Sequence, residues 1–372
     1  MLTMCTAIET KSIATRKYSQ RKIAGHIETK RNQQGAVLIL FVLALPILFG
    51  FSALAIDYAY AYVVRNELQN AADATALAGT GCLYPRIECG NSTSSAPDFT
   101  TASSRANTAL SLNKTANATI TNGSIVTGYW NVTNPSSGMQ AFPGASHFPA
   151  VQVTIKKDTG LNGGPVNTFF ARIFGIDTVP ITSTATAIIS SPGTVMQGLL
   201  PIAMTQCMYD NFWDSSSNQP KNDPATGKPY VFKIGSSYHY GPCESGQWTS
   251  FTQDTNNVPT IRDLITQGNP TPLSIGTNTW IQPGTQNTVF TSVNDCSAAG
   301  DKSCEYVTIP IVVNVSTHSS VPIVAFACLH IDLAVGGSEK YIQGEMSTKC
   351  TPLNSSGIGP AYGAITPPRL VQ

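Results

Sequence analysis

An uninterrupted apolar stretch near the amino terminus constrains this 372-residue chain more than any other feature. Residues 36–56 carry no charge and are almost all apolar. An α-helix rises about 1.5 Å per residue, so about 20 such residues cross a hydrocarbon core of about 30 Å. The stretch therefore predicts a transmembrane helix, in which Pro46 introduces a bend. A buried helix of a soluble protein is the alternative, but such helices seldom stay free of charge over this length.

Helical periodicity continues beyond the apolar stretch. Residues 57–78 contain neither Pro nor Gly, and Gly79 is expected to end the helix because glycine adopts the left-handed cap conformation at little cost. One helix over 36–78 would be about 65 Å long and would protrude about 30 Å beyond the bilayer. Its Ala-rich face could pack on another protein's helix or on the chain's own domain. The helix-packing candidates on this face are Ala61, Val64, Leu68 and Ala71.

The same segment resembles a known family. The Gly35-Ala36 pair, the mid-span Pro46, Asp57 at the exit and above all the run 68–74 (Leu-Gln-Asn-Ala-Ala-Asp-Ala) are similar to the amino-terminal segment of TadG-like Flp pilus-assembly proteins of the bacterial tight-adherence system. Residues 169–189 are more loosely similar to a downstream strand of such proteins. The resemblance implies a scaffold or anchor in pilus assembly and adherence, with protein partners in the assembly machinery and homo-oligomerisation left open.

Charge asymmetry predicts the orientation in the membrane. Residues 1–35 carry seven Lys and Arg side chains against two Glu, whereas the 22 residues after the apolar stretch hold Arg65 as their one basic side chain. The positive-inside rule then places the amino terminus in the cytoplasm and the bulk of the chain outside, as in a single-pass protein of the bacterial inner membrane.

Two kinds of amino-terminal processing remain alternatives. A cleaved signal peptide would need a small-x-small site, which Ala53 and Ala55 could supply, although its apolar core would be shorter than this one. A type IV prepilin would be cut after a glycine such as Gly35, but prepilins usually carry Glu five residues beyond the cut, where this chain has Leu40. A pilin-like subunit is therefore a weaker hypothesis than an uncleaved membrane anchor.

Cysteine placement agrees with an extracytoplasmic region. Cys5 precedes the apolar stretch and the other eight cysteines follow it, an even number that suggests disulfides in the oxidising periplasm. Pairing of sequence neighbours gives Cys82–Cys89, Cys207–Cys243, Cys296–Cys304 and Cys328–Cys350. A zinc site is disfavoured, because the sequence has no Cys-x-x-Cys pair.

The remaining chain predicts an α+β to mainly β extracytoplasmic region. Five segments are expected: a basic tail 1–35, the transmembrane helix 36–56, a juxtamembrane helix 57–79, a small α+β domain 80–195 and a β-rich disulfide-bearing domain 196–372. In the α+β domain, strands are expected at 118–132, 149–157 and 180–189, and short helices at 104–117 and 167–175. In the β-rich domain, strands are expected at 229–235, 287–293 and 305–315. Residues 321–335 are expected to form a buried strand pair, since about 15 residues holding His330 and Asp332 are too few and too polar for a second span. The last 16 residues are expected to be irregular.

Few chemical motifs accompany this architecture. Charged residues make up 12% of the chain, against about 25% in ordinary soluble domains, and no basic stripe outside the first 35 residues suggests nucleic-acid binding. The sequence has neither H-E-x-x-H nor G-x-S-x-G. Asp214-Ser215-Ser216-Ser217-Asn218 only partly fits an Asp-x-Ser-x-Ser metal site and is interpreted as a loop.

The sequence therefore predicts a non-enzymatic, membrane-anchored envelope protein with no catalytic residue, cofactor or metal. A membrane-tethered periplasmic enzyme or ligand-binding protein is the alternative from a different class. A buried polar cluster in a cleft of 196–372 would favour that alternative, whereas a flat sheet with a polar face would not.

Overall fold

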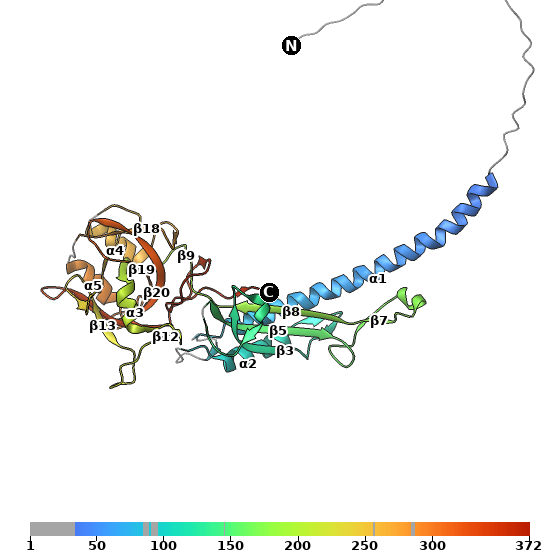
Figure 1. Cartoon of the computed structure of the whole chain (residues 1–372), viewed down its shortest axis with the longest axis horizontal. Coiled ribbons are helices and arrows are strands. Elements are labelled where there is room, and N and C mark those ends of the chain that lie inside the picture. The colour runs from blue at the N-terminus through green and yellow to red at the C-terminus, as the bar shows by residue number, and fades with distance from the viewer. Residues whose placement is uncertain (1–33, 85–88, 91–95, 145, 256, 284–286) are drawn as a thin grey trace, which may run out of the picture. The chain divides into compact units, whose positions relative to one another are not determined.

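A computed structural model describes residues 34–84, 89–90, 96–144, 146–255, 257–283 and 287–372 (Figure 1). The chain divides into two compact units, residues 1–53 and 54–372. The domain boundaries expected at 35, 56, 79 and 195 stay predictions. Cys5 and almost all of the basic tail lie outside the described residues.

A single long helix, α1 (Gln34–Thr80), contains the apolar stretch and the periodic segment that follows it. The expectation that Gly79 caps this helix is wrong, because the helix runs on to Thr80 and Gly79 does not adopt a positive φ. A Cβ at Gly79 would lie 2.9 Å from Ala106 Cβ and 3.0 Å from Ala102 O in α2 (Phe99–Leu110). This glycine is therefore needed for the close approach of two helices.

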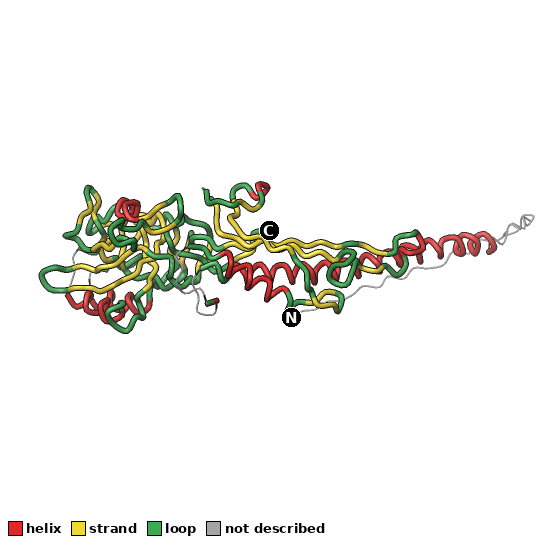
Figure 2. The backbone as a smooth tube through the Cα atoms, turned by 90° about the horizontal axis from the view of Figure 1, so that it is seen from below, coloured by secondary structure: helices red, strands yellow, loops and turns green. Residues whose placement is uncertain are grey.

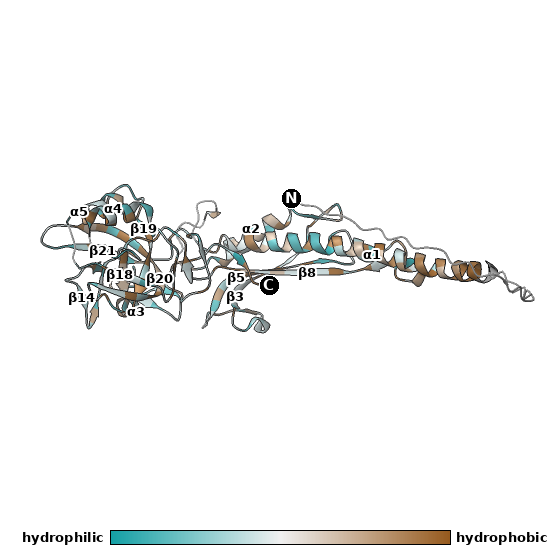
Figure 3. Cartoon of the chain, turned by 90° about the horizontal axis from the view of Figure 1, so that it is seen from above, coloured by the Kyte–Doolittle hydropathy of each residue, from teal (hydrophilic) through white to brown (hydrophobic). Residues whose placement is uncertain are grey.

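The first core of the 54–372 unit lies between these helices and an antiparallel sheet. The sheet has the order β23-β8-β5-β3-β4. Its strands are β3 (Ser124–Asn131), β4 (Met139–Gln140), β5 (His147–Lys157), β8 (Ile181–Ile188) and β23 (Arg369–Leu370). Figure 3 shows α2 and the carboxy-terminal part of α1 over the same sheet.

Residue alternation explains how this sheet contributes to the core. Val151, Val153 and Ile155 of β5 are fully buried in the cluster that includes α1 and α2, as the alternating pattern predicted. The other face holds a smaller cluster around Trp130 and Phe148. The strand expected over 118–132 is broken, because β2 (Ala118–Thr119) ends before β3 begins.

The second core surrounds a larger, mostly antiparallel sheet with the order β13-β21-β20-β19-β10-β16, in which β18 also pairs with β20. β10 and β19 pair in parallel. The strands are β10 (Ile202–Thr205), β13 (Val231–Ile234), β16 (Gly246–Trp248), β18 (Asn278–Ile281), β19 (Tyr306–Val312), β20 (Ser319–Val335) and β21 (Tyr341–Met346). The expected strand pair at 321–335 is thus one long strand, bulged opposite β21 between Ile331 and Leu333.

Three helices accompany this sheet: α3 (Gln206–Phe212), α4 (Val258–Gln267) and α5 (Asn287–Cys296). Figures 2 and 3 show α4 and α5 on the same side of the strands, and Figure 3 shows α3 on the opposite side. The strand expected at 287–293 is wrong. Its buried residues are Val289, Phe290 and Val293, a helical spacing that outweighs the β-propensity of Thr and Val.

Short elements connect these parts. They are β1 (Lys114–Thr115), β2, β6 (Val166–Asn167), β7 (Thr178–Val179), β9 (Thr194–Val195), β11 (Trp213–Asp214), β12 (Gln219–Pro220), β14 (His239–Tyr240), β15 (Cys243–Glu244), β17 (Leu273–Ser274), β22 (Ser355–Ser356) and the 3-10 turns η2 (Pro135–Ser137) and η3 (Ala171–Phe174). The carboxy terminus is not wholly irregular as expected, because β23 pairs with β8 through Arg369↔Ile188 and Leu370↔Ala187.

Candidate functional site

The amino-terminal part of α1 presents apolar side chains to its surroundings. Among the described residues, α1 is the one helix long and apolar enough to cross a membrane. Figure 3 shows the dominance of apolar residues in this part of the helix. The large apolar side chains that it exposes are Val37, Leu38, Ile39, Leu40, Phe41, Val42, Leu43, Ile47, Leu48, Phe49, Phe51, Leu54 and Ile56. A helix exposing this much apolar surface is suited to a lipid environment.

The Ala-rich face of α1 packs on the chain's own sheet. Val64, Leu68 and Ala71 are buried in the first core, and Ala61 packs against it while partly exposed. Of the two alternatives for this face, the structure shows packing within the chain. Val151, Val153 and Ile155 belong to the same buried cluster, and contact of this face with a partner's helix stays a prediction.

Asp57, the first charged residue after the apolar stretch, binds a loop that lies more than a hundred positions later. Its Oδ1 accepts the backbone N–H of Phe169 at 2.7 Å. Its Oδ2 accepts the N–H groups of Phe170 at 2.9 Å and of Ala171 at 2.6 Å. With 9% of its surface exposed, Asp57 has its charge matched by three donors rather than by water.

The three donors lead into η3: Ala171 is its first residue, Phe170 its N-cap and Phe169 the residue before, and the Phe170 side chain does not cap the turn. A carboxylate at the start of a helical turn satisfies these groups and meets the positive end of their dipoles. Burial raises the pKa of the Asp57 carboxyl, but the three N–H donors and the Arg172 guanidinium outweigh this effect and hold it below its usual value. Asp57 is therefore ionised at neutral pH.

The loop bound by Asp57 is a hairpin of β6, η3 and β7, here called the apolar hairpin (Val166–Val179). Its two strands pair through Val166↔Val179 and Asn167↔Thr178. The Thr168 hydroxyl donates to Ile176 O at 2.6 Å, and Gly175 ends η3 with a φ of 77°. The large apolar side chains that the hairpin exposes are Phe169, Phe170, Ile173, Phe174 and Ile176.

The sequence predicted a short helix in this hairpin but not the link of the hairpin to α1. The expected helix over 167–175 is reduced to the four-residue 3-10 turn η3, because Asn167 belongs to β6; the turn ends before Gly175, as the glycine suggested. An isolated acidic residue directly after an apolar stretch was visible in the sequence. Its partners are backbone groups, however, and no side-chain pattern identifies those in advance.

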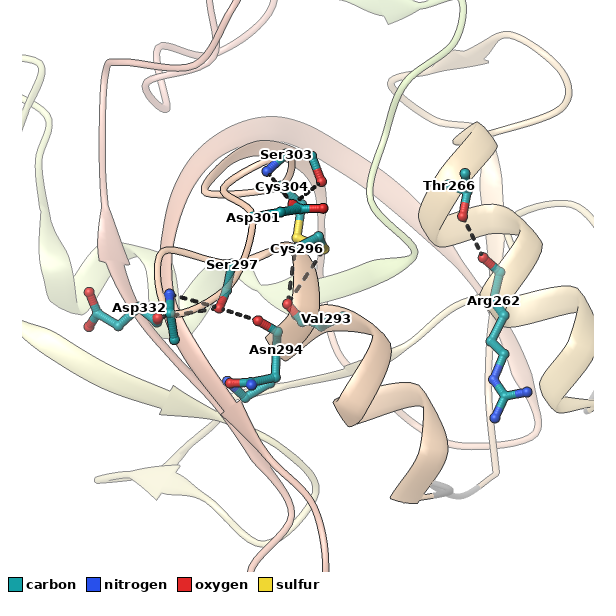
Figure 4. The surroundings of a disulfide bond; sticks show 12 residues. Arg262, Thr266, Val293, Asn294, Cys296, Ser297, Asp301, Ser303, Cys304 and Asp332 are labelled. Atoms are coloured by element: carbon teal, nitrogen blue, oxygen red, sulfur yellow. Dashed lines mark hydrogen bonds between the residues drawn. A yellow bond between two sulfur atoms is a disulfide. The ribbon is translucent and has the colours of Figure 1, made fainter.

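The eight cysteines after the apolar stretch form four disulfides, between the sequence neighbours named above. The Cα–Cα distances are 5.6 Å for Cys82–Cys89, 5.4 Å for Cys207–Cys243, 4.9 Å for Cys296–Cys304 and 5.7 Å for Cys328–Cys350. Figure 4 shows Cys296–Cys304 where α5 meets the following loop, beside the Val293 carbonyl and the Asp301–Ser303 hydrogen bonds. Such bridges are typical of proteins from oxidising compartments.

A half-buried ionic cluster lies on the second sheet. His330 Nε2 is 3.2 Å from Glu305 Oε1, and His330 Nδ1 is 3.4 Å from Asp332 Oδ1 and 3.5 Å from Glu345 Oε1. The Tyr306 ring stacks on the imidazole with centroids 4.7 Å apart. The neighbouring Glu345 raises the pKa of His330, with Glu305 and Asp332 adding to this effect and burial opposing it. One imidazolium thus faces three carboxylates, and the cluster keeps a net negative charge.

The Asp214–Asn218 segment and the other polar side chains of the described residues do not form a metal site. No group of three or more His, Cys, Asp or Glu side chains there could hold a metal ion. Asp214 accepts hydrogen bonds from the Ser216 hydroxyl at 2.6 Å and the Ser217 hydroxyl at 2.7 Å, which lower the pKa of Asp214 to about 2. This arrangement is the local turn that the sequence predicted.

Two family models match the chain over the segments just described. Residues 35–81 match a model described as "Putative Flp pilus-assembly TadE/G-like", and residues 85–187 match one described as "Putative Tad-like Flp pilus-assembly". The first match covers nearly all of α1. The second covers the apolar hairpin, α2 and almost all of the first sheet. No curated protein and no solved structure matches the chain.

Proposed function

Because the chain carries both Tad-like domains of the Flp pilus-assembly family, we propose that it is a single-pass anchor and scaffold for pilus assembly in the bacterial envelope. Residues 36–56 span the inner membrane, the basic tail stays in the cytoplasm and the disulfide-bearing region lies in the periplasm. The role is non-enzymatic and needs no cofactor. The partners are components of the pilus-assembly machinery, with the chain acting alone or as a homo-oligomer.

One observation carries the proposal: the apolar helix and the first core share α1 without a break. The helix that exposes Ile56 continues into the core at Val64 and Leu68. The anchor therefore continues into the first core as a helix, with no loop between them. Such a continuous helix suits a scaffold whose domain is carried at the membrane.

Intact mass and thiol counting on the protein purified from membranes test the anchor. Full-length mass with Cys5 as one free thiol, rising to nine thiols after reduction, is the expected result. A mass lacking the first 35 residues would instead indicate a pilin-like subunit. A mass lacking about 55 residues would indicate a secreted protein without an anchor. Nine free thiols before reduction would contradict the periplasmic placement.

Genetic complementation tests the scaffold. Cells lacking the chain should lose surface pili and adherence, and the wild-type chain should restore both. Leu43→Arg places a charge in the middle of the span and is expected to weaken insertion by about 2.5–3.5 kcal/mol. We expect this variant to leave the membrane fraction and to fail in complementation. Leu112→Arg is the matched control, because Leu112 is 79% exposed and lies outside the apolar stretch. Normal piliation without the chain would contradict the proposal.

A further inference from the structure

We propose that the apolar hairpin is a second membrane contact, which inserts its exposed side chains into the periplasmic interface of the bilayer that α1 spans. The ligand is a phospholipid surface. This inference rests on the proposed membrane anchoring, and it assigns a function to a surface that the anchor alone does not explain.

The position of the apolar hairpin along α1 supports a membrane contact. Asp57 directly follows the apolar stretch, so its three hydrogen bonds hold the start of η3 at the level where α1 leaves the bilayer. The Ser183 hydroxyl of β8 donates to the Arg65 carbonyl at 3.4 Å, whereas the hairpin bonds Asp57, about two helical turns earlier in α1. The first sheet therefore leads toward the apolar stretch as it reaches the hairpin.

The side chains on the surface of the apolar hairpin also suit a membrane interface. Ile173 is 80% exposed and Phe174 is 67% exposed, at the point of the hairpin that follows the Asp57 contacts. The hairpin has two charged residues, both exposed: Arg172 beside Ile173 and Phe174, and Asp177, which directly precedes β7. Aromatic and aliphatic side chains accompanied by an arginine suit the boundary between acyl chains and anionic headgroups.

The backbone N–H groups of the apolar hairpin are largely hydrogen-bonded. An apolar environment penalises free N–H and C=O groups, so a loop can enter the interface only if its own groups are paired. Asp57 accepts the N–H groups of the three residues 169–171, and the N–H groups of Ile173, Gly175 and Ile176 bond to carbonyls inside the hairpin. The hairpin thus presents side chains to its surroundings while its backbone donors are largely satisfied.

Tyrosines on α1 continue the same surface. Tyr58 is 75% exposed and Tyr62 is 55% exposed, and both lie within about two turns of Asp57. Tyrosine favours the membrane interface, because its ring is apolar and its hydroxyl reaches water. Tyr60, which contacts Phe169, lies between them on α1, so aromatic side chains of the helix and of the hairpin meet here. Such a surface favours lipid over a protein partner that would need a shaped pocket.

A depth measurement on the full chain tests the inference. In a Cys5→Ser background, Ile173→Cys and Phe142→Cys each receive an environment-sensitive dye. These two positions are equally exposed, at 80% each, and lie at opposite ends of the first sheet. Because β5 is 11 residues long, they are on the order of 30 Å apart along the strands. The protein is reconstituted into vesicles of phosphatidylethanolamine and phosphatidylglycerol, with or without lipids carrying a nitroxide near the headgroup.

We expect nitroxide lipids to quench the dye at position 173 by at least about twofold and to leave the dye at position 142 unchanged. Equal quenching at both positions, or none at either, overturns the inference. A blue-shifted but unquenched dye at position 173 whose emission depends on protein density overturns it too, because a second copy of the chain would then cover the hairpin.

Failure of the anchor gives a different result. If alkaline carbonate extracts the protein from the vesicles, both the membrane anchoring and the hairpin contact are wrong. If the protein resists extraction and position 173 stays unquenched, the anchor stands and the hairpin contact alone is wrong. A second variant, Ile173→Ser with Phe174→Ser and a dye at Phe169→Cys, should reduce quenching at position 169 without changing resistance to extraction.

Discussion

The Asp57 carboxylate and the Ala171 backbone amide lie 2.6 Å apart, although 114 positions separate them in the chain. This contact joins the end of the apolar stretch, in the first family match, to the apolar hairpin, in the second. A carboxylate that accepts three N–H groups stabilises the fold more than one that accepts a single donor. Removing it leaves three backbone N–H groups without an acceptor.

Replacement of Asp57 by asparagine should therefore loosen the apolar hairpin. The amide keeps the shape of the side chain but loses the charge, and its NH2 group cannot accept the N–H donors of η3. We expect hydrogen exchange at the Phe169, Phe170 and Ala171 amides to accelerate by about tenfold or more. Exchange mass spectrometry on the full chain in detergent measures the effect.

Asp73→Asn is the control for this variant. Asp73 lies on the same helix and accepts the Gln69 side-chain amide at 2.8 Å, but it does not bond the hairpin. Unchanged exchange over 168–177 in Asp57→Asn would show that the carboxylate does not hold the hairpin.

Local periodicity made part of this fold predictable. The apolar stretch at 36–56 and the alternation of Val151, Val153 and Ile155 specify a helix and a half-buried strand without reference to the rest of the chain. The helix at Asn287–Cys296 was missed because Thr and Val were weighted by propensity, although Val289 and Val293 already lie four positions apart.

The candidate site was less predictable, because it depends on contacts between distant segments. The sequence shows an isolated Asp57 and predicts a short helix at 167–175, and only the fold brings the two together. Gly79 was misjudged for the same reason. Its role comes from Ala102 and Ala106 on another helix, whereas a capping role was inferred from its position after the periodic segment alone.

Gly79→Ala should destabilise the first core. In a helix this substitution ordinarily stabilises by about 0.5–1 kcal/mol, because alanine loses less conformational entropy. Here the new methyl group would lie 2.9 Å from Ala106 Cβ and 3.0 Å from Ala102 O, so the helices must separate. We expect a net loss of about 1–3 kcal/mol in the free energy of unfolding, measured by chemical denaturation. Gly81→Ala, whose nearest neighbour lies at 3.4 Å, is the control and should change stability little.

Removal of the Cys328–Cys350 disulfide should destabilise the second core. Cys328 is fully buried in β20, and the bridge closes a loop of 22 residues. Replacement of both cysteines by alanine is expected to lower the free energy of unfolding by about 3 kcal/mol, because the unfolded chain regains the freedom of that loop. The matched pair at Cys82 and Cys89 closes a separation of 7, so its removal should cost about 1 kcal/mol less. Equal stability of all three proteins would contradict the prediction.

His330 should make the stability of the second core depend on pH. Glu345, Glu305 and Asp332 face this imidazole, and together they raise its pKa in the folded protein above the unfolded value near 6.5. A raised pKa means that the folded state binds the proton more tightly. The stabilisation is therefore complete below about pH 6.5 and is lost as the pH rises through the folded-state pKa.

The thermal midpoint of the wild-type protein should accordingly fall from mildly acidic to mildly alkaline pH. His330→Gln removes the titrating group and leaves three carboxylates without their cation. We therefore expect a lower midpoint at acidic pH and a flatter pH profile. His239→Gln changes an exposed histidine of β14 and should keep the wild-type slope. Parallel profiles for the wild type and His330→Gln would show that the cluster does not stabilise the fold through protonation of His330.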